Sequence, residues 1–255
     1  MRKSLKFRFP NGRGQHLAGI FDLPETPPLF YGVFSPCFTC PKESHAAVKV
    51  CRALAERGVG MLRFDVTGVG ESEGSFAHTG FSSYRLDIIA ACHAVAAEYA
   101  EPKLLIGHSI SGTAGLSAVR YLPSVQALAT IGSPRDPAYT IDKFRKHSLM
   151  VEKEGGVELN VVGRRIMVRK EFIDDMLAQD VAGDTARIDR QLFIFHAPHD
   201  NIVSFENARV IYDRATCDRE LVPLDEDATH LLENRPDDAV FIAETLNDWF
   251  RLHLK

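Results

Sequence analysis

Short apolar segments alternate with segments of helical periodicity along most of this 255-residue chain, and that alternation constrains its fold more than any other feature. The predicted strands lie at residues 5–9, 16–23, 30–34, 60–64, 103–107, 127–131, 192–196 and 220–223, and the predicted helices at 44–57, 81–98, 111–121, 205–215 and from about 236. Strands and helices in such alternation pair in parallel through right-handed crossovers. The sequence therefore predicts an α/β fold with a mostly parallel central sheet flanked by helices.

The alternation breaks between residues 135 and 190. Two strand-like runs at 157–161 and 165–168 surround Val162-Gly163-Arg164, which is typical of a hairpin rather than of a βαβ unit. We expect a core made of residues 1–134 and 191–255, with residues 135–190 inserted as a cap that carries a hairpin and helices.

Charge and composition exclude several classes of protein. The chain has 30 basic and 34 acidic side chains, for a net charge of −4, whereas nucleic-acid-binding domains cluster cations. No apolar stretch approaches the ~20 residues that span a bilayer, and no signal peptide is apparent. Five cysteines without an export signal favour reduced thiols in a cytoplasm. We expect a cytoplasmic protein that binds neither nucleic acid nor membrane.

Ser109 is the strongest candidate for a nucleophile. It lies between the apolar run 104–107 and a helical pattern, which is the context of a nucleophile elbow, where small neighbours prevent clashes. The usual pattern is G-x-S-x-G; Gly107 fits it, and Ser111 replaces the last glycine with another small residue, followed by Gly112. The alternative is that Ser109 is only a helix N-cap.

A serine hydroxyl needs a base and a carboxylate that orients the base. Asp200 follows a predicted strand and His230 follows the last one, so that the order is Ser109, Asp200, His230. Asp200 could instead be a loop N-cap, and His230 a packing histidine. The rival acids are Asp136, Asp225 and Asp227.

The backbone N–H groups of Ile110 and Phe38 are the predicted oxyanion-hole donors, since one follows the nucleophile and the other lies in the loop after the third strand. Cys37 and Cys40 form a C-x-x-C motif in that loop, for which redox chemistry and simple loop packing are both open.

Two other motifs fail as cofactor sites. Pro198 prevents the helix that would align His196 with His199 for a metal, and no third ligand has fitting spacing. The loop 65–74 has Glu73 where the dinucleotide pattern requires glycine, and it lacks a P-loop lysine. We expect neither metal nor cofactor, and we expect Asp65 to bond loop amides.

Taken together, these residues resemble the α/β-hydrolase superfamily, in which the pattern matched by Asp65, Gly68, Gly70 and Ser72 accompanies the elbow. More narrowly, several segments look like the hydrolase domain associated with OsmC-type peroxide-reductase proteins: 37–44, 62–65, 81–83, 131–134 and 196–200. In that family the elbow usually has glycine where this chain has Ser111, and the loop has histidine where it has Pro36. The resemblance implies a functional association with an OsmC-type protein.

These features predict a serine hydrolase that cleaves a small ester, thioester or amide. Its partner would be a small-molecule acyl substrate, and the sequence leaves the oligomeric state open. Apolar residues of the insertion could line an acyl pocket or merely pack the cap on the sheet: Phe144, Leu149, Met150, Phe172, Ile173 and Met176. The alternatives are a non-catalytic hydrolase-like binding module and a redox-associated accessory module.

Overall fold

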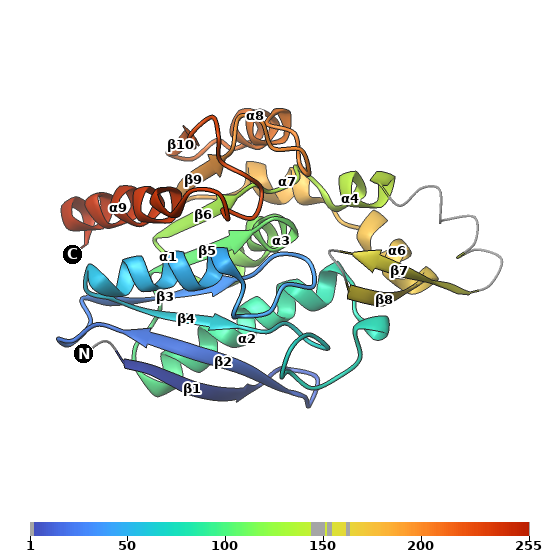
Figure 1. Ribbon diagram of the computed structural model, residues 1–255, viewed down its shortest axis with the longest axis horizontal. Helices are drawn as coiled ribbons and strands as arrows, with labels where there is room; N and C mark the ends of the chain where they lie inside the picture. Colours follow the sequence, from blue (N-terminus) through green and yellow to red (C-terminus); the bar gives the residue numbers. More distant parts are fainter. Residues whose placement is uncertain (1–2, 144–150, 152–154, 162–163, 255) are drawn as a thin grey trace.

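The computed structural model describes residues 3–143, 151, 155–161 and 164–254 (Figure 1). The strands are β1 (Lys3–Pro10), β2 (His16–Leu23), β3 (Phe30–Ser35), β4 (Val59–Phe64), β5 (Leu104–His108), β6 (Ala127–Ile131), β7 (Gly156–Val161), β8 (Arg164–Arg169), β9 (Gln191–His196) and β10 (Arg219–Pro223). The helices are α1 (His45–Glu56), α2 (Phe81–Glu98), α3 (Ile110–Ala118), α4 (Pro137–Lys143), α6 (Lys170–Leu177), α7 (Val181–Ala186), α8 (Glu206–Arg214) and α9 (Pro236–His253). The predicted succession of strands and helices is confirmed, with ends shifted by a few residues.

The central sheet has eight strands in the order β1-β2-β4-β3-β5-β6-β9-β10. β1 and β2 pair antiparallel at one edge, and β2 pairs antiparallel with β4. The remaining strands of the sheet, β4, β3, β5, β6, β9 and β10, pair in parallel. The carboxyl ends of β3, β5, β6 and β9 therefore meet at one edge of the sheet. In open α/β sheets this edge is where ligand sites form.

Helices cover both faces of the sheet, with α1 and α9 on one side and α2, α3 and α8 on the other (Figure 1). Side chains alternate along each strand: Leu105 packs under α2 and α3, while Leu104 and Ile106 pack under α1 and α9. A strand that is buried on both faces reads as a continuous apolar run, which is why the sequence located these strands well.

The segment between β6 and β9 forms a separate two-stranded antiparallel sheet, β7-β8, together with α4, α6 and α7. The predicted hairpin is confirmed, although its turn residues 162 and 163 lie outside the described residues. Asp175 of α6 accepts hydrogen bonds from the N–H and the hydroxyl of Ser82, at 2.8 and 2.6 Å, at the start of α2. Asp184 of α7 accepts one from Ser117 of α3 at 2.6 Å. The inserted segment is thus attached to the α2–α3 side of the core.

Within the described ranges, none of the helices combines the length and the apolar character that crossing a bilayer requires.

Candidate active site

Ser109 occupies the sharp turn between β5 and α3, with φ 57° and ψ −129°. Positive φ is uncommon for a residue with a side chain and persists where the surroundings enforce it. Here the N–H of Ser109 donates to the carbonyl of Ile131 at 2.8 Å, which attaches the turn to β6. The turn therefore holds the Ser109 hydroxyl at the carboxyl edge of the sheet.

Close packing between β5 and α3 requires two glycines. A Cβ at Gly107 would lie 2.5 Å from the Cα of Gly112, and a Cβ at Gly112 would lie 2.0 Å from Oγ of Ser133. Ser111 is the small residue expected at this contact, and its carbonyl oxygen does lie 2.5 Å from a Cβ at Gly107, but the residue that must lack a side chain is Gly112, one residue later.

Ser111 has a different role in the turn. It is fully buried, and its Oγ donates a hydrogen bond of 2.5 Å to the carbonyl of Pro36 in the loop after β3. The two positions where the chain departs from the family pattern are therefore bonded to each other. This bond connects α3 to the loop that carries the predicted oxyanion donor Phe38.

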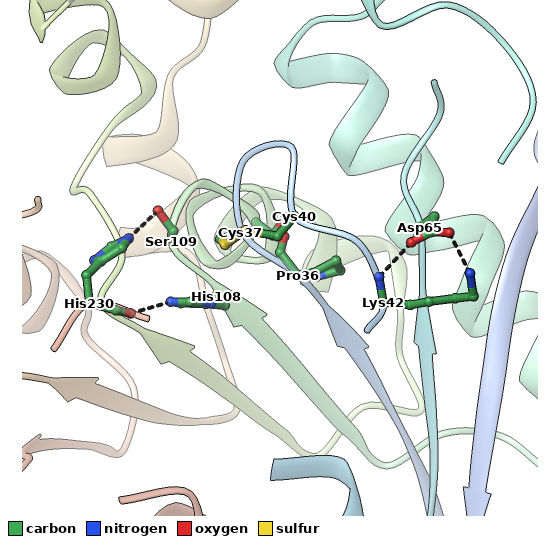
Figure 2. Close-up of a disulfide and its surroundings, with 9 residues drawn as sticks. Pro36, Cys37, Cys40, Lys42, Asp65, His108, Ser109 and His230 are labelled. Atoms are coloured by element: carbon green, nitrogen blue, oxygen red, sulfur yellow. Dashed lines mark hydrogen bonds and ion pairs between the residues drawn. A yellow bond between two sulfur atoms is a disulfide. The ribbon is translucent and has the colours of Figure 1, made fainter. Parts of the chain in front are cut away.

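The structure brings Ser109, Asp200 and His230 together at the edge of the sheet. Nε2 of His230 lies 3.0 Å from Oγ of Ser109, and Nδ1 lies 2.7 Å from Oδ2 of Asp200. Figure 2 shows His230 pointing toward Ser109. All three side chains are largely buried, at 6–8% exposed. Their geometry is the one in which a serine, a base and an orienting carboxylate act as a unit.

The Asp200 carboxylate is well satisfied. Its Oδ1 accepts the N–H groups of Ile202 and Val203 at 2.8 and 2.9 Å. Burial alone would raise the pKa of Asp200, but the hydrogen bonds with His230 and with these amides hold the pKa below its ordinary value. Asp200 is therefore ionised at neutral pH, and its Oδ2 is placed to accept a hydrogen bond from Nδ1 of His230.

Two of the three rival acids, Asp136 and Asp225, are engaged elsewhere. Asp136 accepts the N–H of Tyr139 at 2.8 Å, at the start of α4, and Asp225 accepts the N–H of Asp227 at 2.9 Å. Among the described residues, Asp200 is the carboxylate that forms a hydrogen bond with the His230 ring.

His196 and His199 point to different environments. Buried His196 donates from Nε2 to the carbonyl of Val203 at 2.7 Å and lies 3.6 Å from Asp200, whereas His199 is exposed. Burial lowers the pKa of His196, so that the ring is neutral at pH 7. The described part of the chain holds no cluster of three or more potential metal ligands.

His108 is a site residue that the sequence analysis missed. It is fully buried, and its Nε2 donates to the carbonyl of His230 at 2.7 Å (Figure 2). Burial and the neighbouring His230 lower the pKa of His108 to about 3, so that the ring is neutral. His108 positions the His230 loop from below the elbow. The available sequence signal was its place directly before Ser109.

The loop after β3 lies next to the elbow, because β3 and β5 pair with Ser35 opposite Gly107. In this loop Cys37 and Cys40 form a disulfide (Figure 2). The expectation of reduced thiols is wrong for this pair, since the turn brings their Cα atoms to 5.1 Å, within the range that a disulfide requires. Phe38 lies between the two cysteines.

Asp65 fixes the far end of this loop. Its Oδ1 accepts the N–H of Lys42 at 2.6 Å, and its Oδ2 accepts Nζ of Lys42 at 2.8 Å and the N–H of Glu71 at 2.9 Å. The prediction that Asp65 bonds loop amides is confirmed. Gly70 has φ +57°, and a Cβ there would lie 2.2 Å from Oδ2 of Asp65, which explains the glycine.

Only three of the six apolar residues that were predicted to line a pocket or pack the cap are among the described residues. Phe144, Leu149 and Met150 lie outside the described residues. Phe172 and Met176 are 2% and 1% exposed and pack in the core on the α2–α3 side, with Ile173 packed against it. The Phe172 ring lies 5.9 Å from that of Phe38. In the described part, the packing interpretation fits Phe172 and Met176 better than an open pocket.

Comparison with known proteins places this geometry in a family. Residues 42–151 match the family described as "Serine aminopeptidase, S33". The esterase domain of a Rhodothermus marinus protein has 34% sequence identity over 98% of both chains, with a TM-score of 0.74. Mouse alpha/beta hydrolase domain-containing protein 10 superposes over 97% of this chain and 98% of its own, with a TM-score of 0.79 and 20% identity. The chain belongs to the α/β-hydrolase superfamily.

Among curated proteins, the mitochondrial palmitoyl-protein thioesterase ABHD10 of Rattus norvegicus is 30% identical over 146 residues. The aligned region is 53% of this chain and 47% of that protein, so the chain spans about half the length of the curated relatives it matches. The fold and the family together place this chain in the class of hydrolases.

Proposed function

We propose that the chain is a serine hydrolase that cleaves a small ester, thioester or amide. The observation that carries the proposal is the continuous hydrogen-bonded series from Ser109 through His230 to Asp200. An esterase domain aligned over almost the full chain supports it.

In this mechanism, Oγ of Ser109 attacks the acyl carbon while its proton passes to Nε2 of His230. Asp200 stabilises the imidazolium that forms. The N–H groups of Ile110 and Phe38 bind the negative oxygen of the tetrahedral intermediate. His230 then returns the proton to the leaving group, and water repeats the sequence to release the acid.

Residues 135–190 act as a cap over this site in our proposal. The ring contact of Phe38 with Phe172 of α6, at 5.9 Å, supports a cap that packs directly against the oxyanion loop. An acyl thioester is the substrate class we favour among the three, because the matched curated relatives are thioesterases. Cytoplasmic location and association with an OsmC-type protein stay predictions.

The test is turnover of p-nitrophenyl esters from acetyl to decanoyl and of the corresponding acyl thioesters. We expect Ser109→Ala to lower kcat by at least ~1,000-fold without changing the far-UV spectrum. Ser117→Ala is the matched control, since Ser117 lies in the same helix but bonds Asp184. Unchanged turnover in Ser109→Ala would contradict the proposal, and saturable ligand binding without turnover in the wild type would favour the binding module.

A further inference from the structure

A hollow lies beside the elbow, on the side of the disulfide. Its volume is about 190 Å³, and its walls include Cys37, Cys40, Ser44, His45, His108 and Glu233. His108 lines it, whereas Ser109 is absent from its described lining. The hollow is therefore separate from the space in which Ser109 meets His230.

Three buried polar atoms on these walls have no hydrogen-bond partner within the described part of the chain. They are Oγ of Ser44, Nε2 of His45 and Nδ1 of His108. Nε2 of His108 donates to the His230 carbonyl, so Nδ1 of the neutral ring is an acceptor. Buried polar atoms are normally paired. The three atoms indicate a site for a small polar molecule that carries a hydrogen-bond donor.

The disulfide itself forms part of the wall, and its two sulfurs differ in access. Cys37 is 4% exposed, whereas Cys40 is half-buried. Disulfides exchange when a thiolate reaches one sulfur, and access decides which sulfur is attacked. Cys40 is the more exposed of the two residues, so we expect a thiolate to attack its sulfur.

We propose that this pocket binds a small thiol compound that reduces the Cys37–Cys40 disulfide. The volume equals about six waters, which suits a thiol of a few heavy atoms. Nδ1 of His108 accepts a hydrogen bond from such a molecule, and Ser44 and His45 supply the remaining polar contacts.

The exchange balances with two molecules of thiol. The first thiolate forms a bond to Sγ of Cys40, the disulfide bond breaks, and Cys37 leaves as a thiolate that takes up a proton. The second thiolate attacks the ligand sulfur of the mixed disulfide and releases Cys40, which is protonated in turn. Two thiols are oxidised to one disulfide, and the protein gains two electrons and two protons.

Reduction would act on the hydrolase through Phe38, a consequence that rests on the proposed function. The ends of the loop have anchors that do not involve the disulfide: the carbonyl of Pro36 is bonded to Ser111, and the N–H of Lys42 to Asp65. Only the turn between the cysteines loses its covalent restraint. We expect the Phe38 amide to become less well oriented, and acyl transfer to fall reversibly.

The test is reduction of the oxidised protein by 2-mercaptoethanol, followed by alkylation with iodoacetamide and peptide mapping. We expect two further alkyl groups, on Cys37 and Cys40, and the same result in Ser109→Ala. The double variant Ser44→Ala/His45→Ala should react at least ~5-fold more slowly, because it lacks two polar contacts to the thiol. Replacing exposed His93 by alanine, a matched control, should leave the rate unchanged.

Three results would overturn the proposal. They are an absence of alkylation at Cys37 and Cys40, equal rates in the double variant and the wild type, or reduction by a protein dithiol but not by 2-mercaptoethanol. Serine-directed labelling of Ser109 in both redox states separates this proposal from the hydrolase proposal. If Ser109 is labelled in neither redox state, the proposed hydrolase function fails. The alkylation of Cys37 and Cys40, measured by mass, still decides the thiol proposal independently.

Discussion

Individual residues at the elbow combine strain with dense hydrogen bonding. Ser109 has the positive φ of a strained turn, and the hydrogen bond from its N–H to the carbonyl of Ile131 keeps it there. Ser111 and Pro36, which depart from the family pattern, bond to each other and so attach the oxyanion loop to α3. The departures are therefore compatible with a complete site.

Asp200→Asn tests the orienting carboxylate. The asparagine NH2 would donate to Nδ1 of His230 and place the ring proton on Nε2, facing Ser109, where it blocks proton transfer. We expect kcat/KM to fall about 1,000- to 10,000-fold while the fold is retained. Asp225→Asn is the matched control and should keep its activity. Similar losses in both variants would assign the orienting role elsewhere.

At the scale of elements, the strands and helices of the core were predictable because their patterns are local. β5 and β6 are apolar on both faces, and the small residues on either side of Ser109 follow the spacing of a nucleophile elbow. The glycine contact was harder to predict, since it depends on which residue of α3 meets Gly107 across the turn. The contact between His108 and the His230 loop joins residues that are 122 positions apart in the sequence, and no local sequence pattern predicts such a contact. The disulfide likewise depends on the turn between Cys37 and Cys40.

Gly112→Ala tests the packing of α3 on β5. The new Cβ would lie 2.0 Å from Oγ of Ser133 and 2.7 Å from the carbonyl of Gly107, so the helix must shift. We expect the free energy of unfolding to drop by about 2–3 kcal/mol. In Gly115→Ala, the matched control in the same helix, the nearest atom is the flexible end of Leu128 at 3.2 Å, and the loss should be under about 1 kcal/mol. Urea denaturation compares them, and equal losses would refute the packing argument.

For the whole molecule, buried neutral histidines make stability depend on pH. Burial and His230 lower the pKa of His108 to about 3 in the folded state, while the unfolded value is about 6.5. Below pH 6.5 the unfolded chain binds a proton that the folded chain does not bind. The free energy of unfolding therefore falls as pH falls, by about 1.4 kcal/mol per pH unit.

Urea unfolding at about pH 7 and pH 4.5 measures this dependence. We expect the wild type to lose about 2–3 kcal/mol more than His108→Gln, whose amide can still donate to the His230 carbonyl. His196 shifts in the same direction and contributes equally to both proteins. Parallel pH profiles would show that His108 does not carry the effect.

The central claim is that Ser109 is an activated nucleophile. The most direct measurement is covalent labelling of the purified protein with a fluorophosphonate, followed by intact mass and peptide mapping. We predict a single adduct on Ser109, lost in Ser109→Ala and strongly suppressed in His230→Ala. A folded wild-type protein that forms no adduct, or an adduct on another residue that survives Ser109→Ala, would contradict the account.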